Sequence, residues 1–369
     1  MHVMMLDEHA VGRHLGRSIR DSAGHVLLQA GTRLSAKFVR ALRERGYRTV
    51  YAVNELAPDI AVDDALREET RARATQLVQA TLARAARAER LEISSLRKVV
   101  DQILAEMRGR TDAAFSVATL RSVDEYTFVH SLNVCLYSVM LGAALAYDPA
   151  TLRNLAMGAL LHDIGKVNYA DLVRRAGPLS PEEFAALQQH TTDGYHMLRE
   201  HDGVDLLSAH MAYQHHERLD GSGYPRALKD KQILPFARIA AVADMFDAMT
   251  GDRPYKTGSP PHAAMDELVQ QAGDKLDAYL VHQFAQRVAV YPTGSIVALS
   301  DRRIGVVCGQ TDRGPNRPRV RVLTDADQRL VAPTEVEAAG ALSIRAVLSD
   351  YPPAIRRQIA AQATKRPSA

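Results

Sequence analysis

Histidines and carboxylates gather in one part of the sequence. Of the fourteen histidines, seven lie between residues 162 and 216, and two of these are adjacent in HHERLDGSGYP, residues 215–225. Another histidine directly precedes an aspartate in LLHDIGK, residues 160–166. Histidine and carboxylate side chains without a thiolate are a ligand set for iron, manganese, zinc or nickel at a hydrolytic site. The pattern therefore predicts a metal site that acts on an anionic substrate.

The adjacent polar pairs suit more than one metal ion. These pairs are His162–Asp163 and His215–His216. Neighbouring residues on a helix point about 100° apart, so each pair can serve two metals, or one metal and a supporting partner. A hydroxide held between two metals about 3.5–4 Å apart is a nucleophile at neutral pH and attacks phosphorus in line. The arrangement therefore predicts phosphoester hydrolysis.

Further polar residues interrupt apolar helical runs. His130 lies inside FVHSLNV, and His190 follows an Ala-Leu-Gln-Gln run. Asp244 and Asp247 lie in RIAAVADMFDAMT, three residues apart, and so share one face of a helix. Because a carboxylate buried without partners is costly, a ligand role is better supported for them than a structural one.

Helices must position these residues. The spacing of apolar residues predicts helices over 122–146, 149–161, 181–200, 203–214, 235–249, 262–271 and 277–289. Pro149, Pro181 and Pro261 lie where a proline in the first turn is tolerated. We therefore expect an all-helical catalytic domain over residues 110–288, and a fold that is mainly α.

The first 109 residues have a different pattern. Residues 1–60 predict a small mixed α/β module, with a helix capped by Ser35 and ended by Gly46 and a strand in RTVYAV. It is either a plain scaffold or a regulatory or dimerising module. Residues 63–109 predict one helix or two, either a coiled connector that supports a homodimer or surface helices packed on their own domain.

The residues after 290 change pattern again. Short β-branched runs between turn residues predict a small β appendage over 290–345. Residues 346–369 are expected to form a C-terminal tail, frayed at its end.

Composition limits the classes of function. The chain is 46% hydrophobic and 24% charged, which is ordinary for a soluble globular protein. The net charge of +3 does not argue for a nucleic-acid polymer as partner, but it is compatible with a small anionic substrate. The two cysteines, Cys135 and Cys308, form no CxxC pair, which fits a reducing cytosol. With no signal-peptide pattern and no membrane-span pattern, we expect a cytoplasmic protein.

Three blocks in order carry a family resemblance. HDIGK, then HHERLDGSGYP, then DAMTGDRPYK resemble the bacterial HD-GYP domain, a subgroup of the HD metal-dependent phosphohydrolases. The resemblance covers roughly residues 110–288. It implies hydrolysis of cyclic di-GMP to linear pGpG or GMP on an all-helical fold. It also implies two or three metal ions, most often iron or manganese.

The resemblance implies metal-binding and catalytic roles. The residues that match the family's metal ligands are His130, His162, Asp163, His190, His215, His216 and Asp244, with Asp163 as the bridge between metals. Lys166 matches the lysine that reaches a substrate phosphate or assists the leaving oxygen. Asp247 is expected to support a ligand from behind.

Substrate contacts follow from the same blocks. Gly223, Tyr224 and Pro225 form the GYP stretch that walls the pocket, and Arg253 and Lys256 match positions that hold the dinucleotide. Asp220 is expected to pin the loop by hydrogen bonds.

One position bears on the number of metals. Family members with a third metal carry a glutamate four residues before the first histidine, and here that residue is Tyr126. Glu125 is one residue away and would project from a different part of the helix. We therefore expect two metals.

Two other functions stay open. The domain could be a non-catalytic receptor that binds a cyclic dinucleotide or a signalling-domain partner through the GYP face. It could also be an HD hydrolase for another cyclic dinucleotide. The full set of candidate ligands favours the cyclic di-GMP phosphodiesterase.

Overall fold

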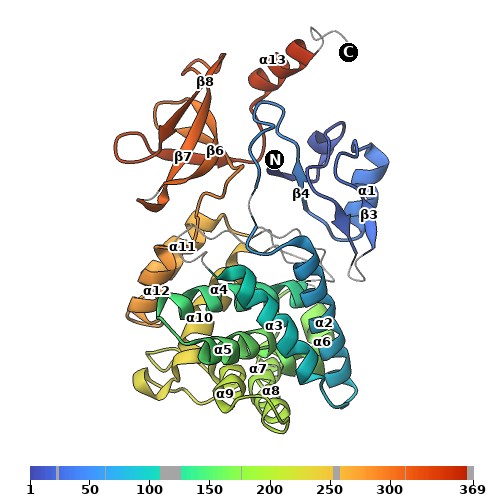
Figure 1. Cartoon of the computed structure of the whole chain (residues 1–369), viewed down its shortest axis with the longest axis vertical. Coiled ribbons are helices and arrows are strands. Elements are labelled where there is room, and N and C mark those ends of the chain that lie inside the picture. Colours follow the sequence, from blue (N-terminus) through green and yellow to red (C-terminus); the bar gives the residue numbers. More distant parts are fainter. Residues whose placement is uncertain are drawn as a thin grey trace.

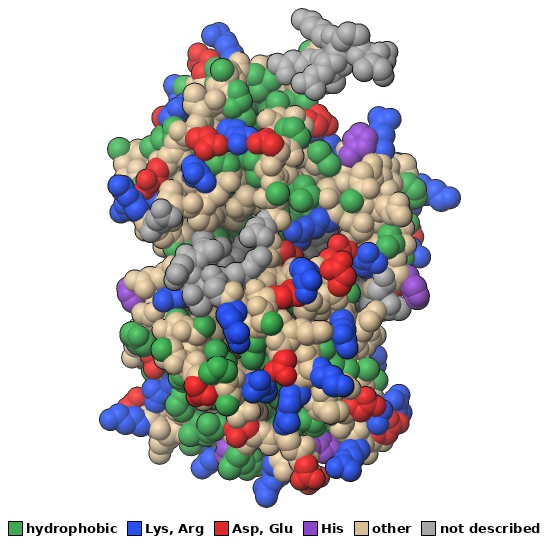
Figure 2. All heavy atoms as spheres, viewed as in Figure 1, with side chains coloured by type: hydrophobic (Ala, Val, Ile, Leu, Met, Phe, Trp, Pro, Cys, Tyr) green, Lys and Arg blue, Asp and Glu red, His purple; other side chains and the backbone are tan. Residues whose placement is uncertain are grey.

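The computed structural model of the chain describes residues 1–21, 25–62, 64–108, 126–175, 177–251, 258–311 and 313–363. A body of packed helices lies below two smaller units that contain strands (Figure 1). Acidic and basic side chains are interspersed over the face seen in Figure 2, in keeping with the small net charge.

The helical body confirms the predicted mainly α fold. Its helices are α4 (Tyr126–Ala144), α5 (Pro149–Leu161), α7 (Pro181–Gln188), α8 (His190–Arg199), α9 (Leu206–Gln214), α10 (Pro235–Thr250), α11 (Pro261–Gln270) and α12 (Ala278–Ala285). α5 has the predicted bounds, because the Asp148 carboxylate caps it by accepting from the backbone N–H groups of Ala150 and Thr151. The predicted start of the first of these helices at residue 122 lies outside the described residues.

Two features of the body differ from expectation. The helix expected over 181–200 is interrupted at Gln189, which separates α7 from α8. A 3-10 segment, η3 (Ile164–Tyr169), and the short helix α6 (Ala170–Arg174) follow α5. The break matters for the site because His190 becomes the first residue of α8 rather than a residue inside a longer helix.

Residues 64–108 form two helices that pack on the body. These are α2 (Glu68–Ala86) and α3 (Ile93–Met107), and their buried apolar side chains belong to the same core as those of α4, α5 and α10. With those side chains in the core of their own chain, the helical spacing no longer argues for a coiled homodimer through this segment.

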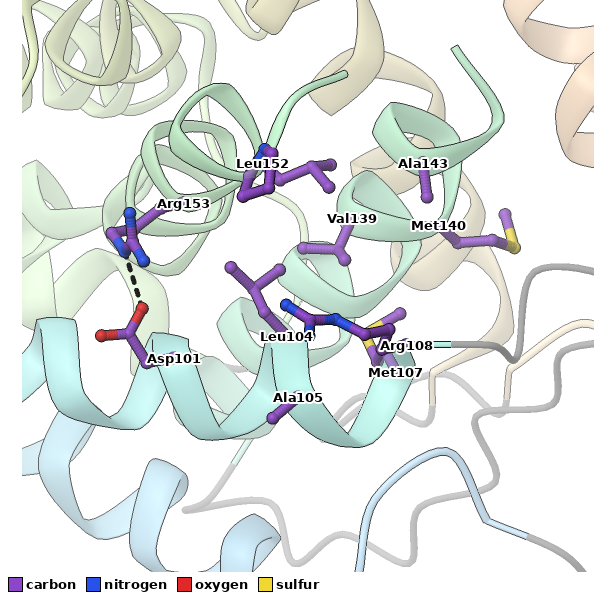
Figure 3. A pocket seen from close by; sticks show the side chains of 11 residues that line it. Asp101, Leu104, Ala105, Met107, Arg108, Val139, Met140, Ala143, Leu152 and Arg153 are labelled. Atoms are coloured by element: carbon purple, nitrogen blue, oxygen red, sulfur yellow. Dashed lines mark hydrogen bonds and ion pairs between the residues drawn. The ribbon is translucent and has the colours of Figure 1, made fainter. Parts of the chain in front are cut away.

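α3, α4 and α5 enclose a cavity of about 280 Å³. Figure 3 shows the Asp101 carboxylate paired with the Arg153 guanidinium at its rim, at 2.6 Å. The remaining wall is largely apolar and comes from Leu104, Met107, Val139, Met140, Ala143 and Leu152.

The N-terminal module is mixed α/β. β1 (His2–Met5) pairs antiparallel with β4 (Thr49–Ala52), and β2 (Ile19–Arg20) pairs antiparallel with β3 (Val26–Leu28). α1 (Ala36–Glu44) begins at Ser35, whose Oγ accepts from the Phe38 N–H. Gly46 follows the helix with a φ of +84°, which a glycine adopts without strain.

The β appendage is one antiparallel sheet. The strands β5 (Ile296–Leu299), β6 (Ile304–Thr311), β7 (Gly314–Thr324), β8 (Leu330–Glu337) and β9 (Ile344–Leu348) lie in the order β8-β7-β6-β5-β9. The expectation of a tail from residue 346 onward needs correction. β9 pairs with β5, and α13 (Pro353–Ala363) buries Ile355 and Ile359 against the sheet. These two isoleucines are four positions apart in the sequence, so they share one face of the helix.

The two ends of the chain contact one another. The Arg13 guanidinium binds both oxygens of Asp350, and the Tyr351 hydroxyl donates to Asn54 Oδ1 at 3.0 Å. Ile60 lies in the same apolar cluster as residues of β5, β6 and α13. We call residues 1–62 and 291–363 together the terminal unit.

One described helix is long and apolar enough to cross a membrane. It is the stretch Thr127–Ala144 of α4, and 78% of that window is buried inside the protein. Burial to this extent is typical of the core helix of a helical domain.

Candidate metal centre

Several helix ends bring the predicted donors together. His130 lies on α4, His162 and Asp163 follow the last residue of α5, and His190 begins α8. His215 and His216 follow α9, and Asp244 lies on α10. All are buried except His216, whose side chain is 17% exposed.

Asp163 lies at the middle of these donors. Its Oδ1 is 3.4 Å from His190 Nε2 and 3.5 Å from His215 Nε2. Its Oδ2 is 3.3 Å from His162 Nε2 and 3.6 Å from His130 Nε2. Each carboxylate oxygen therefore faces a different pair of imidazoles, which is the arrangement of a carboxylate that can bridge two ions.

Backbone carbonyl groups orient three of the imidazoles. Nδ1 of His162, His190 and His215 lies 2.8, 2.7 and 3.0 Å from a carbonyl oxygen in the preceding turn. Because a carbonyl oxygen only accepts, Nδ1 carries the proton and Nε2 presents a lone pair.

The lone pairs of these three imidazoles point to a missing partner. All three Nε2 atoms and Asp163 Oδ1 are buried without a hydrogen-bond partner among the described residues. Buried polar atoms are rarely left unsatisfied, and a cation at this point would satisfy all four. The cluster is therefore capable of binding metal.

The donors fall into two groups that share one residue. Asp163, His190, His215 and His216 offer ligand atoms within 4.8 Å of one another, and so do His130, His162 and Asp163. Asp244 lies beside the second group, with Oδ1 3.2 Å from His130 Nε2. Its Oδ2 is 3.8 Å from His216 Nδ1.

His130 is held by a carboxylate instead of a carbonyl group. Its Nδ1 lies 2.8 Å from Asp247 Oδ2, and Asn133 Nδ2 donates to Asp247 Oδ1 at 2.8 Å. All three residues are buried. Asp247 lies behind His130 and does not approach the centre itself, which is the position expected of a supporting residue.

The electrostatics favour the protonation state that a metal requires. Burial raises the pKa of Asp163, but His162 and Lys166 outweigh it and hold that pKa well below its ordinary value. The neighbouring imidazoles of His130, His216 and His162 together outweigh burial and hold the pKa of Asp244 well below its ordinary value. Burial lowers the pKa of His215 to about 4. Ionised carboxylates and neutral imidazoles are the forms that bind metal ions.

Lys166 and Gly165 belong to the turn that follows Asp163. Lys166 Nζ lies 2.5 Å from Asp163 Oδ2, and its side chain is 24% exposed. A Cβ at Gly165 would lie 2.0 Å from the His190 carbonyl oxygen. Only glycine allows this turn to approach α8 closely enough to bring Asp163 against His190.

The GYP loop folds back on the centre. The Tyr224 ring lies 4.7 Å from the His216 ring, and the Tyr224–Pro225 peptide is cis. A Cβ at Gly223 would lie 2.4 Å from the Glu217 Cα, so the loop passes very close to its own start. Asp220 accepts from the N–H and Oγ–H of Ser222 and so holds the tip of the loop.

A cavity of about 530 Å³ opens beside the centre. His216, Asp244, Gly223 and Tyr224 line one side of it. Gly251 and Gly258 also line it, so the segment between them begins and ends at the cavity. Arg253 and Lys256 belong to that segment and lie outside the described residues, as do Glu125 and the side chain of Tyr126.

Sequence reasoning missed two supporting residues. Asn133 lies three residues after His130 on an apolar helix, a spacing that could have indicated it. Glu217 is buried, and its carboxylate accepts from the backbone N–H groups of Arg226 and Leu228 at 2.8 and 2.9 Å. Its place directly after the paired histidines was the available signal.

A known family model and several known proteins resemble this chain. Residues 103–280 match the family model described as HD domain. A Pseudomonas aeruginosa protein named as a cyclic di-GMP phosphodiesterase is 35% identical over 243 residues, which cover 66% of this chain and 58% of that protein. A Thermotoga maritima protein also named as a cyclic di-GMP phosphodiesterase is 38% identical over 163 residues, covering 44% of each.

A third relative has a different substrate in its name. A Vibrio cholerae protein named as a 3'3'-cGAMP-specific phosphodiesterase is 37% identical over 153 residues, which cover 41% of this chain and 33% of that protein. The chain thus spans a third to somewhat over half of the length of these relatives. The HDIGK, HHERLDGSGYP and DAMTGDRPYK blocks all lie inside residues 103–280, so this part of the chain matches the HD domain and carries the HD-GYP blocks.

Proposed function

We propose that the chain is a metal-dependent phosphodiesterase that hydrolyses cyclic di-GMP to pGpG or GMP in bacterial signalling. One observation carries the proposal: the two oxygens of Asp163 face two separate pairs of imidazoles. In a two-metal hydrolase, the ions stabilise both the attacking and the leaving oxygen, and a carboxylate placed in this way could contact both ions. The relatives named for cyclic di-GMP support the choice of substrate.

We propose that His190, His215 and His216 hold one ion, that His130, His162 and Asp244 hold a second, and that Asp163 bridges them. When bound, such ions supply a Lewis acid for the phosphoryl oxygen and lower the pKa of a water at the site. Iron or manganese suits the imidazole and carboxylate donors, and nickel or zinc is compatible with them. Two ions match the two groups of donors that share Asp163.

The protein's own groups position the substrate. Lys166 carries a cation next to Asp163, where it can contact a phosphoryl oxygen or protonate the leaving 3'-oxygen. The half-buried Tyr224 and the adjacent Gly223 and Pro225 wall the cavity on one side. Arg253 and Lys256 are proposed to bind phosphate or guanine from the segment that starts and ends at the cavity.

Two other functions are less well supported. The cGAMP-specific relative makes another cyclic dinucleotide the second candidate substrate. A purely receptor function is disfavoured, because it gives no reason to retain a complete cluster of oriented, unsatisfied donors. A signalling-domain partner at the GYP face stays a prediction, as does a cytoplasmic location, which the free thiols of Cys135 and Cys308 support.

The test combines metal content with turnover. The protein is purified without oxygen, its metals are counted by elemental analysis, and the same sample is assayed with cyclic di-GMP by chromatography. We expect about two metals per chain and the appearance of pGpG or GMP. Asp163→Asn should retain the fold by circular dichroism but lose metal and activity, whereas Asp202→Asn, at a fully exposed carboxylate, should match the wild type.

Two outcomes would contradict the proposal. Full activity in metal-replete Asp163→Asn would defeat the metal mechanism. Bound metal with no product from cyclic di-GMP, whether the protein is loaded with iron, manganese or nickel, would favour the receptor.

A further inference from the structure

The cavity beside the centre extends well past the proposed metal ligands. One part of its wall is His216 and Asp244, and the C-terminal end of α10 supplies Met245, Ala248 and Met249. Another part is polar and consists of Arg218, Ser222, Gln271 and Lys275. Its volume of about 530 Å³ lies in the range of sites that hold small ligands.

Backbone contacts fix Lys275 beside the GYP loop. The Lys275 carbonyl oxygen accepts from the Leu219 N–H at 3.0 Å, and the Lys275 N–H donates to the Gln271 carbonyl oxygen at 3.0 Å. The connection between α11 and α12 is thereby held against the loop that carries the paired histidines. The lysine is anchored by its backbone while its side chain is exposed and lines the cavity.

The cations of this polar wall have donors to spare. Over the described part of the chain, the Lys275 ammonium has no carboxylate within 4.0 Å. Among the residues that the structure describes, the hydrogen bonds of Arg218 run from Nη1, to the carbonyl oxygens of His215 and Glu217. The nearby Asp220 carboxylate accepts from Ser222 in its own loop, and the charge of Lys275 helps to lower its pKa without forming an ion pair within 4.0 Å. A ligand in the cavity therefore meets unpaired N–H donors next to an apolar wall.

A guanine base matches this chemistry. The methionine and alanine side chains of α10 suit the face of a purine, and the cations suit an edge that carries two acceptors. Guanine presents O6 and N7 together, whereas adenine presents the N7 acceptor beside an N6 donor. In a cyclic dinucleotide, one ribose separates the phosphodiester at the centre from such a base.

We propose that Lys275 is a specificity-determining residue that donates to the O6 and N7 edge of one guanine of the substrate. The proposal rests on the proposed function, since it takes the cyclic dinucleotide as the occupant. Lys275 lies 19 positions after Lys256 and outside the HDIGK, GYP and DRPYK blocks. Its effect is on base selection, and it takes no part in the chemistry at phosphorus.

The experiment compares two variants. Lys275→Met removes the charge and the N–H donors but keeps the length of the side chain, whereas Lys275→Arg keeps the charge and the donors. Lys231→Met, on an exposed turn away from the cavity, is the matched control. Each metal-replete protein is assayed with cyclic di-GMP, cyclic di-AMP and bis(p-nitrophenyl) phosphate. Binding of both dinucleotides is measured separately by equilibrium dialysis.

We expect Lys275→Met to raise KM and Kd for cyclic di-GMP about tenfold, within the range for loss of a good base contact, with kcat unchanged. The values for cyclic di-AMP should not move, so that the preference for guanine falls about tenfold. Lys275→Arg and the control should resemble the wild type. All variants should cleave bis(p-nitrophenyl) phosphate equally, because that diester does not need the base site.

The possible failures are distinguishable. An unchanged KM and Kd for cyclic di-GMP in Lys275→Met overturns the inference and leaves the proposed function standing. Equal weakening of both dinucleotides also overturns it, because the lysine would then act on phosphate charge. A wild type that cleaves the nitrophenyl diester but neither binds nor cleaves cyclic di-GMP overturns the proposed function and the inference with it.

Discussion

Asp247 Oδ2 lies 2.8 Å from Nδ1 of His130, and the other oxygen of the same carboxylate accepts from Asn133. An ionised carboxylate only accepts, so the proton lies on His130 Nδ1 and the Nε2 lone pair faces Asp163 and Asp244. Asp247 thus sets both the tautomer and the ring orientation of a residue 117 positions away in the chain. The centre depends on this pair even though Asp247 does not line it.

Asp247→Asn tests that dependence. An amide oxygen is a weaker acceptor than a carboxylate, and it leaves His130 less basic and less firmly oriented. We expect metal affinity to fall by about 10–100-fold, with activity recovered at high metal concentration. A metal titration followed by activity and by elemental analysis measures this. Asp266→Asn, at an exposed residue of α11, serves as the control, and wild-type affinity in Asp247→Asn would contradict the role.

Gly165→Ala should separate the HDIGK turn from α8. The added methyl would lie 2.0 Å from the His190 carbonyl oxygen and 2.7 Å from the Gly194 nitrogen. Because both neighbours are backbone atoms, relief requires the two elements to move apart. We expect a loss of about 1–3 kcal/mol in the free energy of unfolding together with reduced metal content.

Denaturant unfolding and elemental analysis measure the two effects of Gly165→Ala. Gly309→Ala is the matched control, since the nearest atom to its added methyl is the flexible end of Arg319 at 3.1 Å. A Gly165→Ala protein with wild-type stability and metal content would show that the close approach is not required.

Glu217→Gln should loosen the GYP loop. The carboxylate accepts two backbone N–H groups, and a glutamine would turn one amide NH2 toward a donor. Leaving a buried donor unsatisfied costs about 1–3 kcal/mol. We expect faster hydrogen exchange at Arg226 and Leu228 and a higher KM, while exposed Glu69→Gln changes neither. Unaltered exchange at both amides would argue against this role.

Stability should fall in mild acid because of His2. The side chain is 2% exposed, its ring nitrogens have no hydrogen-bond partner in the described structure, and burial lowers its pKa to about 4. The unfolded chain binds this proton near its ordinary pKa of about 6.5. The free energy of unfolding therefore has its full value above about pH 6.5 and falls by up to about 3 kcal/mol as the pH drops to about 4.

The His2 effect is isolated by comparison with His2→Phe, which does not titrate. Urea unfolding of both proteins between pH 7.5 and 4 should give a steeper loss for the wild type. Parallel curves would show that protonation of His2 does not contribute.

The sequence predicted correctly those helices whose first and last residues carry a local signal, such as a proline in the first turn. α5 has the predicted bounds because a proline stands in its first turn and the His-Asp pair ends its apolar run. The break at Gln189 was not predicted because apolar residues at helical spacing lie on both sides of it, Phe184 and Leu187 before it and Tyr195 and Leu198 after it. α13 was missed because Ile355 and Ile359 bury against the sheet and Ile60, which is far away in the sequence.

The donors of the centre were predictable for a related reason. A histidine beside an aspartate, or beside another histidine, is visible in a linear sequence. Asn133 and Glu217 acquire their roles only from Asp247 and from the backbone of residues 226–228, and those contacts exist only in the folded chain.

The terminal unit has a mechanical consequence for the helical body. The chain enters the body after Val62 and leaves it before Gly294, and a Cβ at Gly294 would come within 3.0 Å of the Val62 side chain. The points where the chain enters and leaves the helical body therefore lie side by side. A rotation of the terminal unit about this place would therefore displace the first and the last residues of the helical body together.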